Sequence, residues 1–253
     1  MNLTYQNIIL HYETYGDKKE VIVILPGWGE TKKSWECLID ILRLDYTVYF
    51  IDYPGFGKSP IPKKTLTMFD YAELIQYFLE VNKIKKPNVI AHSFGGRIAI
   101  LLSSKYGIYM QKLILIDSAG IKPRKTLKSR FCQFSYKFLQ GLADFLPKKI
   151  RTKVKTYLFQ KFSSTDYLNL KEEMRETFKN IVNLDLTPYL PYVQNKTLLL
   201  WGEYDQDTPL KDGIKMNKKI RESELIVFPR CSHFCYLENP YVILKIILSF
   251  LEE

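Results

Sequence analysis

One stretch decides the fold that this sequence predicts: Asn88-Val89-Ile90-Ala91-His92-Ser93-Phe94-Gly95-Gly96-Arg97. Its apolar first half is typical of a buried strand, and the pattern after Ser93 is typical of a helix over 94–106. A serine at such a junction can adopt a strained backbone with an exposed hydroxyl if the residues two before and two after it are small. Ala91 and Gly95 meet this condition. The stretch predicts that Ser93 is a nucleophile, and the alternative is an ordinary turn in which Ser93 caps the helix.

The segments around this stretch alternate between buried strands and amphipathic helices. Continuous runs of β-branched residues and leucine predict strands that are covered on both faces, and apolar spacings of three or four predict helices. The predicted strands are 21–25, 46–51, 89–91, 113–116, 197–201 and 225–228, after an opening antiparallel hairpin at 3–15. The predicted helices are 34–44 with Ser34 as its cap, 68–81, 94–106, one that starts at 185–188 and one that begins near Pro240. This alternation predicts an α/β protein with a mostly parallel, doubly wound sheet.

The alternation is interrupted between 121 and 182, where only helical patterns occur. Apolar residues recur there at helical spacing, and the most regular set is Phe131, Phe134, Phe138, Leu142 and Phe145. Such a stripe packs against other parts of the chain or lines a pocket. We therefore predict an inserted helical cap at 121–182 and a catalytic core formed by 1–120 and 183–253.

Length and composition favour a single catalytic unit. At 253 residues and 46% hydrophobic content, the chain can bury one sizeable core. Four cysteines are too few for a disulfide framework, which favours a reducing compartment, and no leader or membrane-spanning run is evident, so we expect a cytoplasmic protein. The spacing Cys231-x-His233-x-Cys235 fits no common zinc motif, so we expect no metal.

The positive charge is concentrated in one segment. The net charge is +10, and 121–161 alone contains twelve basic residues and one acidic residue. A basic cap could contact an anionic membrane or an anionic amphiphile, and the alternative is a solvated lysine-rich face. No recognition motif for nucleic acid accompanies the charge, so we expect no nucleic-acid partner. The sequence leaves the oligomeric state unknown.

Serine chemistry needs a base for the hydroxyl proton and a carboxylate that orients the base. Of the three histidines, His11 lies in the opening hairpin and His92 lies inside the turn, whereas His233 follows the last predicted strand. His233 is therefore the candidate base. Three aspartates that follow predicted strands are candidate partners, namely Asp205, Asp207 and Asp117.

The order Ser93, Asp205, His233, each after a strand, resembles the α/β-hydrolase superfamily, in which the triad follows in this order. The resemblance covers nearly the whole chain. The elbow reads A-H-S-F-G where the family has G-x-S-x-G, so one small residue replaces another. The other matching motifs are Pro26-Gly27-Trp28-Gly29, Asp52-Tyr53-Pro54-Gly55-Phe56-Gly57-Lys58-Ser59, Trp201-Gly202-Glu203-Tyr204-Asp205 with Pro209, and His233-Phe234-Cys235-Tyr236-Leu237-Glu238-Asn239-Pro240.

The resemblance implies an activity and a set of site residues. It implies ester hydrolysis through an acyl-enzyme, with a small to medium hydrophobic acyl substrate and without a cofactor. Asp205 matches the family's acid motif and ranks ahead of Asp207 and Asp117. The backbone N–H groups of Trp28 and Phe94 are the expected oxyanion donors. The expected substrate-binding side chains are Trp28, Phe94, Phe131, Phe134, Phe138 and Phe234.

Two alternatives to an esterase stay open. Carbon–carbon hydrolases of ring-cleavage products share the lidded scaffold, but they have an H-G-G-G-P-G-A-like oxyanion loop and a tryptophan after the histidine. This chain has Pro26-Gly27-Trp28-Gly29 and Phe234 at those places. The second alternative is a non-catalytic protein that binds a small ligand on the same fold.

Overall fold

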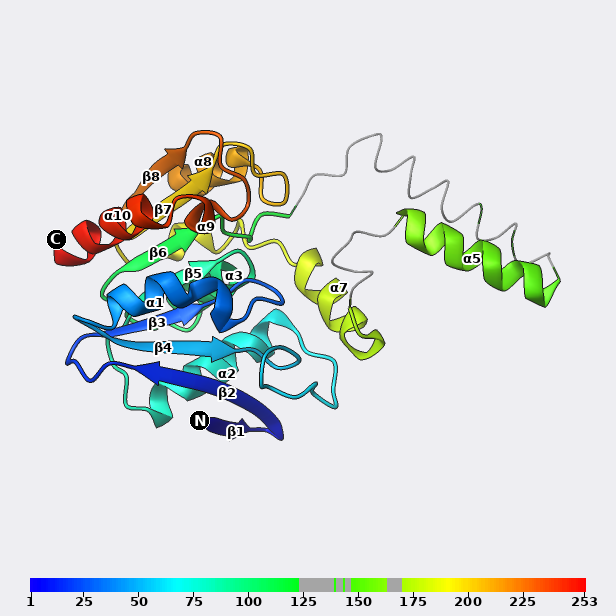
Figure 1. The fold of residues 1–253 in the computed structure, drawn as a ribbon, viewed down its shortest axis with the longest axis horizontal. Coiled ribbons are helices and arrows are strands. Elements are labelled where there is room, and N and C mark those ends of the chain that lie inside the picture. Colours follow the sequence, from blue (N-terminus) through cyan, green and yellow to red (C-terminus); the bar gives the residue numbers. More distant parts are fainter. Residues whose placement is uncertain (123–138, 140–142, 144–146, 163–169) are drawn as a thin grey trace. The chain divides into compact units, whose positions relative to one another are not determined.

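A computed structural model describes residues 1–122, 139, 143, 147–162 and 170–253. Within this part of the chain, eight strands form one sheet in the order β1-β2-β4-β3-β5-β6-β7-β8 (Figure 1). The strands are β1 (Asn2–Tyr5), β2 (Ile8–Tyr15), β3 (Val21–Leu25), β4 (Thr47–Asp52), β5 (Asn88–His92), β6 (Leu113–Ile116), β7 (Thr197–Gly202) and β8 (Ser223–Phe228). The β1–β2 and β2–β4 pairs are antiparallel, and the other pairs are parallel. The predicted α/β fold with a mostly parallel sheet is confirmed.

Helices cover both faces of this sheet, so successive residues of a strand enter two different cores. The helices of the sheet layers are α1 (Glu36–Leu42), α2 (Met68–Val81), α3 (Phe94–Ser104), α8 (Leu210–Lys219), α9 (Cys235–Glu238) and α10 (Pro240–Glu252). In β3, Ile22 and Ile24 belong to the core that contains α1 and α10, whereas Val23 and Leu25 belong to the core that contains α2 and α3. Figure 1 shows these two helix pairs on opposite faces. The sheet is therefore doubly wound.

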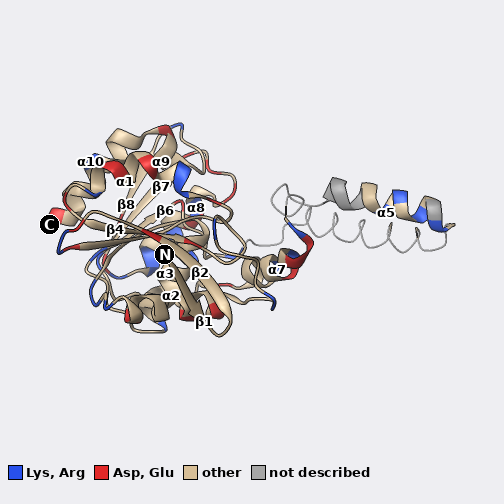
Figure 2. Cartoon of the chain, turned by 60° about the horizontal axis from the view of Figure 1, so that its bottom comes forward, with Lys and Arg blue, Asp and Glu red and all other residues tan. Residues whose placement is uncertain are grey.

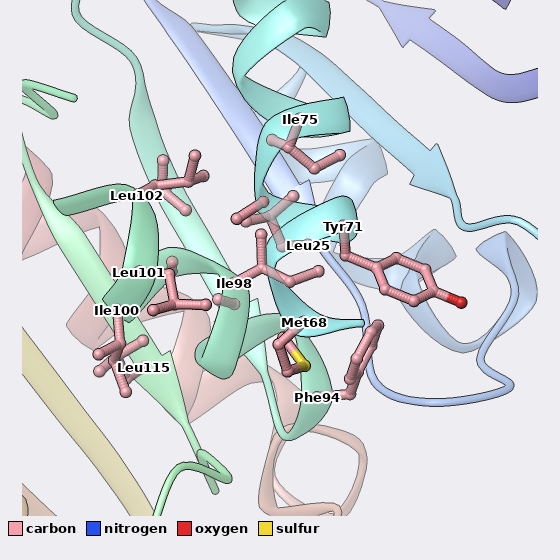
Figure 3. Packing of buried hydrophobic residues seen from close by; sticks show 14 of the residues in the cluster. Leu25, Met68, Tyr71, Ile75, Phe94, Ile98, Ile100, Leu101, Leu102 and Leu115 are labelled. Carbon is pink, nitrogen blue, oxygen red and sulfur yellow. The ribbon is translucent and has the colours of Figure 1, made fainter. Parts of the chain in front are cut away.

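The helix α3, which follows Ser93, is almost completely buried. Its side chains Ile98 and Leu101 are 0% exposed and pack in one cluster with α2 and the strands. Phe94, the first residue of α3, lies beside Met68 and Tyr71 of α2 (Figure 3). Since burial of one such side chain is worth about 1.5–3 kcal/mol, this packing holds the start of α3 in place. Ser93 is thus carried by a rigid part of the fold.

Two predicted helix starts are wrong. Ser34 does not cap a helix, because a 3-10 turn, η1 (Lys32–Trp35), precedes α1 and the Ser34 hydroxyl donates to the carbonyl of Thr31. At 185–188 the side chain of Asp185 accepts from the N–H of Thr187 and closes a turn. Only the short 3-10 segment η3 (Leu190–Tyr192) follows it. Aspartate bonds readily to an N–H two residues on, and this turn competes with a helix.

Residue contacts divide the chain into two units, one formed by 1–122 with 180–253 and the other by 123–179. The elements described after 122 and before β7 are α5 (Lys148–Phe162), η2 (Glu172–Met174), α7 (Arg175–Asn183) and η3. The helix α5 has no acidic residue, and Figure 2 shows its described lysine and arginine positions in blue. Phe131, Phe134 and Phe138 lie outside the described residues, and the cap remains a prediction. No described helix is long and apolar enough to cross a bilayer.

Candidate active site

Ser93 lies in a sharp turn between β5 and α3. Its φ of 45° and ψ of −108° are a strained conformation for a residue with a side chain, and its hydroxyl makes no capping hydrogen bond to α3. The turn needs a glycine at position 95, because a Cβ there would lie 2.0 Å from the carbonyl oxygen of Leu25. The Ser93 side chain therefore does not cap α3, and its hydroxyl is available to other partners.

The structure brings Ser93, His233 and Asp205 together in one hydrogen-bonded row. Ser93 Oγ lies 3.0 Å from His233 Nε2, and His233 Nδ1 lies 2.8 Å from Asp205 Oδ2. The residues follow β5, β8 and β7, whose carboxyl ends lie at the same edge of the sheet. The side chain of Asp205 is 0% exposed and that of His233 is 12% exposed. These distances suit the transfer of the Ser93 proton to His233.

Asp205 is held in place by its own turn. Its Oδ1 accepts from the backbone N–H groups of Asp207 and Thr208, and the Thr208 hydroxyl lies 2.6 Å from Oδ2. Burial alone would raise the pKa of Asp205, but the hydrogen bonds from His233 and Thr208 outweigh it and lower the pKa. The carboxylate is thus ionised and oriented toward His233. Asp205, Asp207 and His233 each have a possible metal-ligand atom within 4.8 Å of the others. Two of these side chains, Asp205 and His233, are already hydrogen-bonded to each other in the row.

The side chains of the two other candidate carboxylates make no hydrogen bond to His233. Asp207 is exposed and contributes its backbone N–H to the turn. Asp117 is fully buried, and its oxygens accept from the backbone N–H groups of Gly202 and Cys235, at 2.7 and 3.2 Å. Burial raises the pKa of Asp117 to about 6. Asp117 therefore joins the ends of β6 and β7 to the start of α9.

The predicted oxyanion donors belong to two neighbouring residues. The rings of Trp28 and Phe94 meet edge to face with 5.1 Å between their centroids. Phe94 is the first residue of α3, so its N–H has no acceptor within the helix and lies at the positive end of the helix dipole. Phe234 is 40% exposed, and its ring lies 5.3 Å from that of His233. Of the described side chains expected to bind substrate, Phe234 thus adjoins His233, whereas the ring of Phe94 is 3% exposed and packs on Tyr71.

Three polar residues around the row, Glu30, His92 and Thr208, were not predicted from the sequence to support it. They could not be predicted, because only the folded chain shows which partners these side chains reach. Thr208 contacts Asp205, whereas His92 lies 2.5 Å from Glu30 beneath the turn. Arg97 is buried, and its Nη1 donates to the carbonyl of Leu184, so it ties α3 to the segment after α7.

Comparisons with known proteins identify relatives that share this fold. The family model for the alpha/beta hydrolase fold matches residues 20–240. A pimeloyl-[acyl-carrier protein] methyl ester esterase of Vibrio vulnificus is 24% identical over 257 residues, which cover 95% of this chain and 97% of that protein. A 2-hydroxy-6-oxononadienedioate/2-hydroxy-6-oxononatrienedioate hydrolase of Comamonas testosteroni is 25% identical, with 97% of this chain and 92% of that protein covered.

A solved structure shows the same fold over the full length. The enol-lactonase from Burkholderia xenovorans superposes with a TM-score of 0.77 at 21% identity, and all of both chains is covered. This chain therefore belongs to the alpha/beta hydrolase fold family and is a hydrolase enzyme.

Proposed function

We propose that this hydrolase cleaves carboxylic esters with a small to medium hydrophobic acyl group, through an acyl-enzyme formed on Ser93. The observation that carries the proposal is the row from Ser93 Oγ to His233 Nε2, at 3.0 Å, and from His233 Nδ1 to Asp205, at 2.8 Å. A serine, a histidine and a buried carboxylate at these distances form a general-base-activated nucleophile. The chemistry needs no metal or cofactor.

In the proposed reaction, His233 Nε2 accepts the hydroxyl proton while Ser93 Oγ attacks the ester carbonyl carbon. The backbone N–H groups of Trp28 and Phe94 donate to the oxyanion that forms. His233 then protonates the leaving alcohol, and the ester carbon stays bound to Ser93. A water molecule, deprotonated by His233, releases the acid and restores the serine. Asp205 stays ionised and stabilises the histidine in its protonated form.

Carbon–carbon bond hydrolysis is the second candidate, because one of the relatives is a hydrolase of a 2-hydroxy-6-oxo dienoic acid. Two features of the chain favour the ester. The oxyanion loop reads Pro26-Gly27-Trp28-Gly29 and not a run of glycines, and Phe234 stands where carbon–carbon hydrolases of this scaffold have tryptophan. An acyl methyl ester carried on a protein, as in the name of the Vibrio relative, is one form that the ester could take.

The location and the contacts of the protein also stay proposals. We propose a cytoplasmic location on the basis of the scattered cysteines. We also propose that the basic segment 121–161 contacts an anionic membrane or amphiphile, and most of its described residues lie in α5. The charge of this helix supports the proposal, since each basic residue near an acidic lipid surface adds about 1 kcal/mol.

A substrate panel tests the proposed function. Purified protein is assayed with p-nitrophenyl esters of two to twelve carbons, with a dimethyl dicarboxylate and with a 2-hydroxy-6-oxo dienoic acid. Ser93→Ala is the matched control, because it removes one hydroxyl that makes no capping bond. We expect ester turnover that Ser93→Ala abolishes, with little change in thermal stability. Turnover of the dienoic acid alone would show that the carbon–carbon candidate is the right one.

A further inference from the structure

A buried ion pair lies behind the proposed triad. His92 Nδ1 lies 2.5 Å from Glu30 Oε1, and the two side chains are 1% and 8% exposed. Glu30 follows the predicted oxyanion loop, and His92 directly precedes Ser93. The pair therefore joins the oxyanion loop to the turn that carries Ser93, and the proposed reaction requires these two segments at a fixed distance. Neither side chain of the pair belongs to the row itself.

The contacts of His92 require a proton on both ring nitrogens. Nδ1 faces the Glu30 carboxylate, and Nε2 lies 2.8 Å from the backbone carbonyl oxygen of His233. A carbonyl and a carboxylate only accept hydrogen bonds, so both nitrogens must donate. Burial alone would lower the pKa of His92, but the charge of Glu30 outweighs burial and raises this pKa. The contacts and the raised pKa both favour the protonated form of His92, whose Nε2 donates to the backbone carbonyl of His233.

Glu30 holds the oxyanion loop with its other oxygen. Oε2 accepts from the N–H of Gly27 at 2.8 Å and from the indole N–H of Trp35 at 2.9 Å. The loop backbone also lies directly on the ion pair, because a Cβ at Gly27 would come within 2.6 Å of Glu30 Oε1 and 2.8 Å of His92 Nδ1. Only glycine fits there. Trp28, a proposed oxyanion donor, is the next residue.

We propose that Glu30 and His92 are positioning residues that set the oxyanion loop and the loop of His233 relative to Ser93. The inference rests on the proposed function, since it assigns the pair to that same site. Buried ion pairs often add little stability over apolar side chains of similar volume, so stability alone does not explain this one. The pair links the nucleophile, the base and one oxyanion donor through two backbone contacts. Its loss should weaken transition-state stabilisation more than substrate binding.

The variants must separate positioning from folding. Loss of one partner leaves an unpaired buried charge, which destabilises proteins strongly, so Glu30→Gln or His92→Gln alone is hard to interpret. The double variant Glu30→Gln/His92→Gln removes both charges together. The matched control is Leu198→Ala, which makes a cavity in the core formed with α1 and α10 without touching the pair. Glu30→Asp keeps the charge and serves as the conservative variant.

The experiment measures kcat, KM, the melting temperature and the rate at which a fluorophosphonate probe labels Ser93. We expect the double variant to fold, to lose about 100-fold in kcat and in labelling rate, and to keep KM within about threefold, as for the loss of one oxyanion donor. Glu30→Asp should recover part of the rate. Leu198→Ala should lower the melting temperature and leave kcat unchanged.

Two outcomes separate this inference from the proposed function. A double variant that labels and turns over as fast as the wild type, or that loses rate only in proportion to its stability as Leu198→Ala does, overturns the positioning role alone. Wild-type protein that neither hydrolyses the esters nor reacts with the probe overturns the proposed function, and the inference with it. Because labelling needs no natural substrate, wild-type protein that labels without hydrolysing the panel still decides the inference by the labelling rate.

Discussion

The hydroxyl of Thr208 lies 2.6 Å from Asp205 Oδ2, on the oxygen that also faces His233. The same hydroxyl lies 3.0 Å from the carbonyl oxygen of Asp117, so it stands between the ends of two strands. With the two backbone N–H groups at Oδ1, the Asp205 carboxylate is surrounded by donors. Donors of this kind favour the charged form, and they leave the carboxylate one orientation.

Asp205→Asn should lower kcat by roughly 10⁴-fold, the size of effect seen in other triads, because the amide cannot orient the histidine in the required tautomer. Asp207→Asn and Asp117→Asn are the matched controls and should each change kcat by less than about tenfold, since neither side chain makes a hydrogen bond to His233. Steady-state kinetics on the best ester of the panel checks the three variants. If Asp117→Asn caused the largest loss of kcat, the carboxylate that orients His233 would be the one after β6 and not the one after β7.

The edge of the sheet where the site lies could be predicted from the sequence, because its signals are local. Runs of β-branched residues and leucine mark where β5, β7 and β8 end, and parallel strands bring their carboxyl ends together. Ser93, Asp205 and His233 each lie within a few residues of the end of such a run. The structure places them in hydrogen-bond contact, and their catalytic roles stay a proposal.

The supporting residues could not be predicted, because their partners are distant in sequence. Glu30 looks like an ordinary loop carboxylate until folding buries it against His92, and Asp117 looks like a turn former until Gly202 and Cys235 meet it. The wrong helix start at Ser34 has a local cause. Serine is a good cap, but here its hydroxyl donates to the carbonyl of Thr31 in a preceding 3-10 turn.

Substitutions at the two small residues beside Ser93, Gly95 and Ala91, should have very different effects on stability and activity. Gly95→Ala places a Cβ 2.0 Å from the carbonyl oxygen of Leu25, so the backbone must shift, and we expect a loss of about 3 kcal/mol or more in the free energy of unfolding together with the activity. Ala91→Gly, which restores the family's G-x-S-x-G, should cost about 0.5–1 kcal/mol and keep kcat. Urea denaturation and turnover per folded molecule check both. Equal activity of the two variants would contradict the close approach at Gly95.

Stability should depend on pH through Asp117. The folded pKa of about 6 lies above the ordinary value of 3.8, because burial favours the protonated form. The native state therefore binds this proton more tightly than the unfolded state. Its stabilising contribution is complete below about pH 4 and is lost as pH rises through about 6. A shift of about two pKa units corresponds to about 3 kcal/mol.

Asp117→Asn isolates this contribution, since the amide is neutral at every pH. Between pH 3.5 and pH 8, the stability of the variant should rise by about 3 kcal/mol relative to the wild type. This rise adds to a constant loss, because the amide oxygen can accept from only one of the two backbone N–H groups that Asp117 binds. Urea midpoints of both proteins at the two pH values give the difference, in which other titrating groups cancel. A difference that stays constant, or that grows toward acid, would show that the buried carboxylate is not disfavoured in its charged form.

The charge of α5 predicts salt-sensitive binding to acidic lipid. Lys148, Arg151 and Lys153 lie within two turns of this helix, which has no acidic residue to neutralise them. At about 1 kcal/mol for each charge near an acidic surface, the three should contribute at least a 100-fold difference in affinity. The interaction should disappear in 0.5 M salt, because salt then screens the attraction between charges that are more than a few ångströms apart.

Sedimentation with neutral and phosphatidylserine-containing vesicles measures this binding. The variant Lys148→Glu/Arg151→Glu/Lys153→Glu should no longer sediment with the acidic vesicles at low salt. Its matched control reverses three exposed lysines of α8, Lys211→Glu/Lys218→Glu/Lys219→Glu, and so makes the same change in net charge elsewhere. The control should still bind, because the proposed contact is local to the basic segment. Binding that falls equally in both variants would reflect net charge alone, and negligible wild-type binding to either vesicle would leave α5 as a solvated basic face.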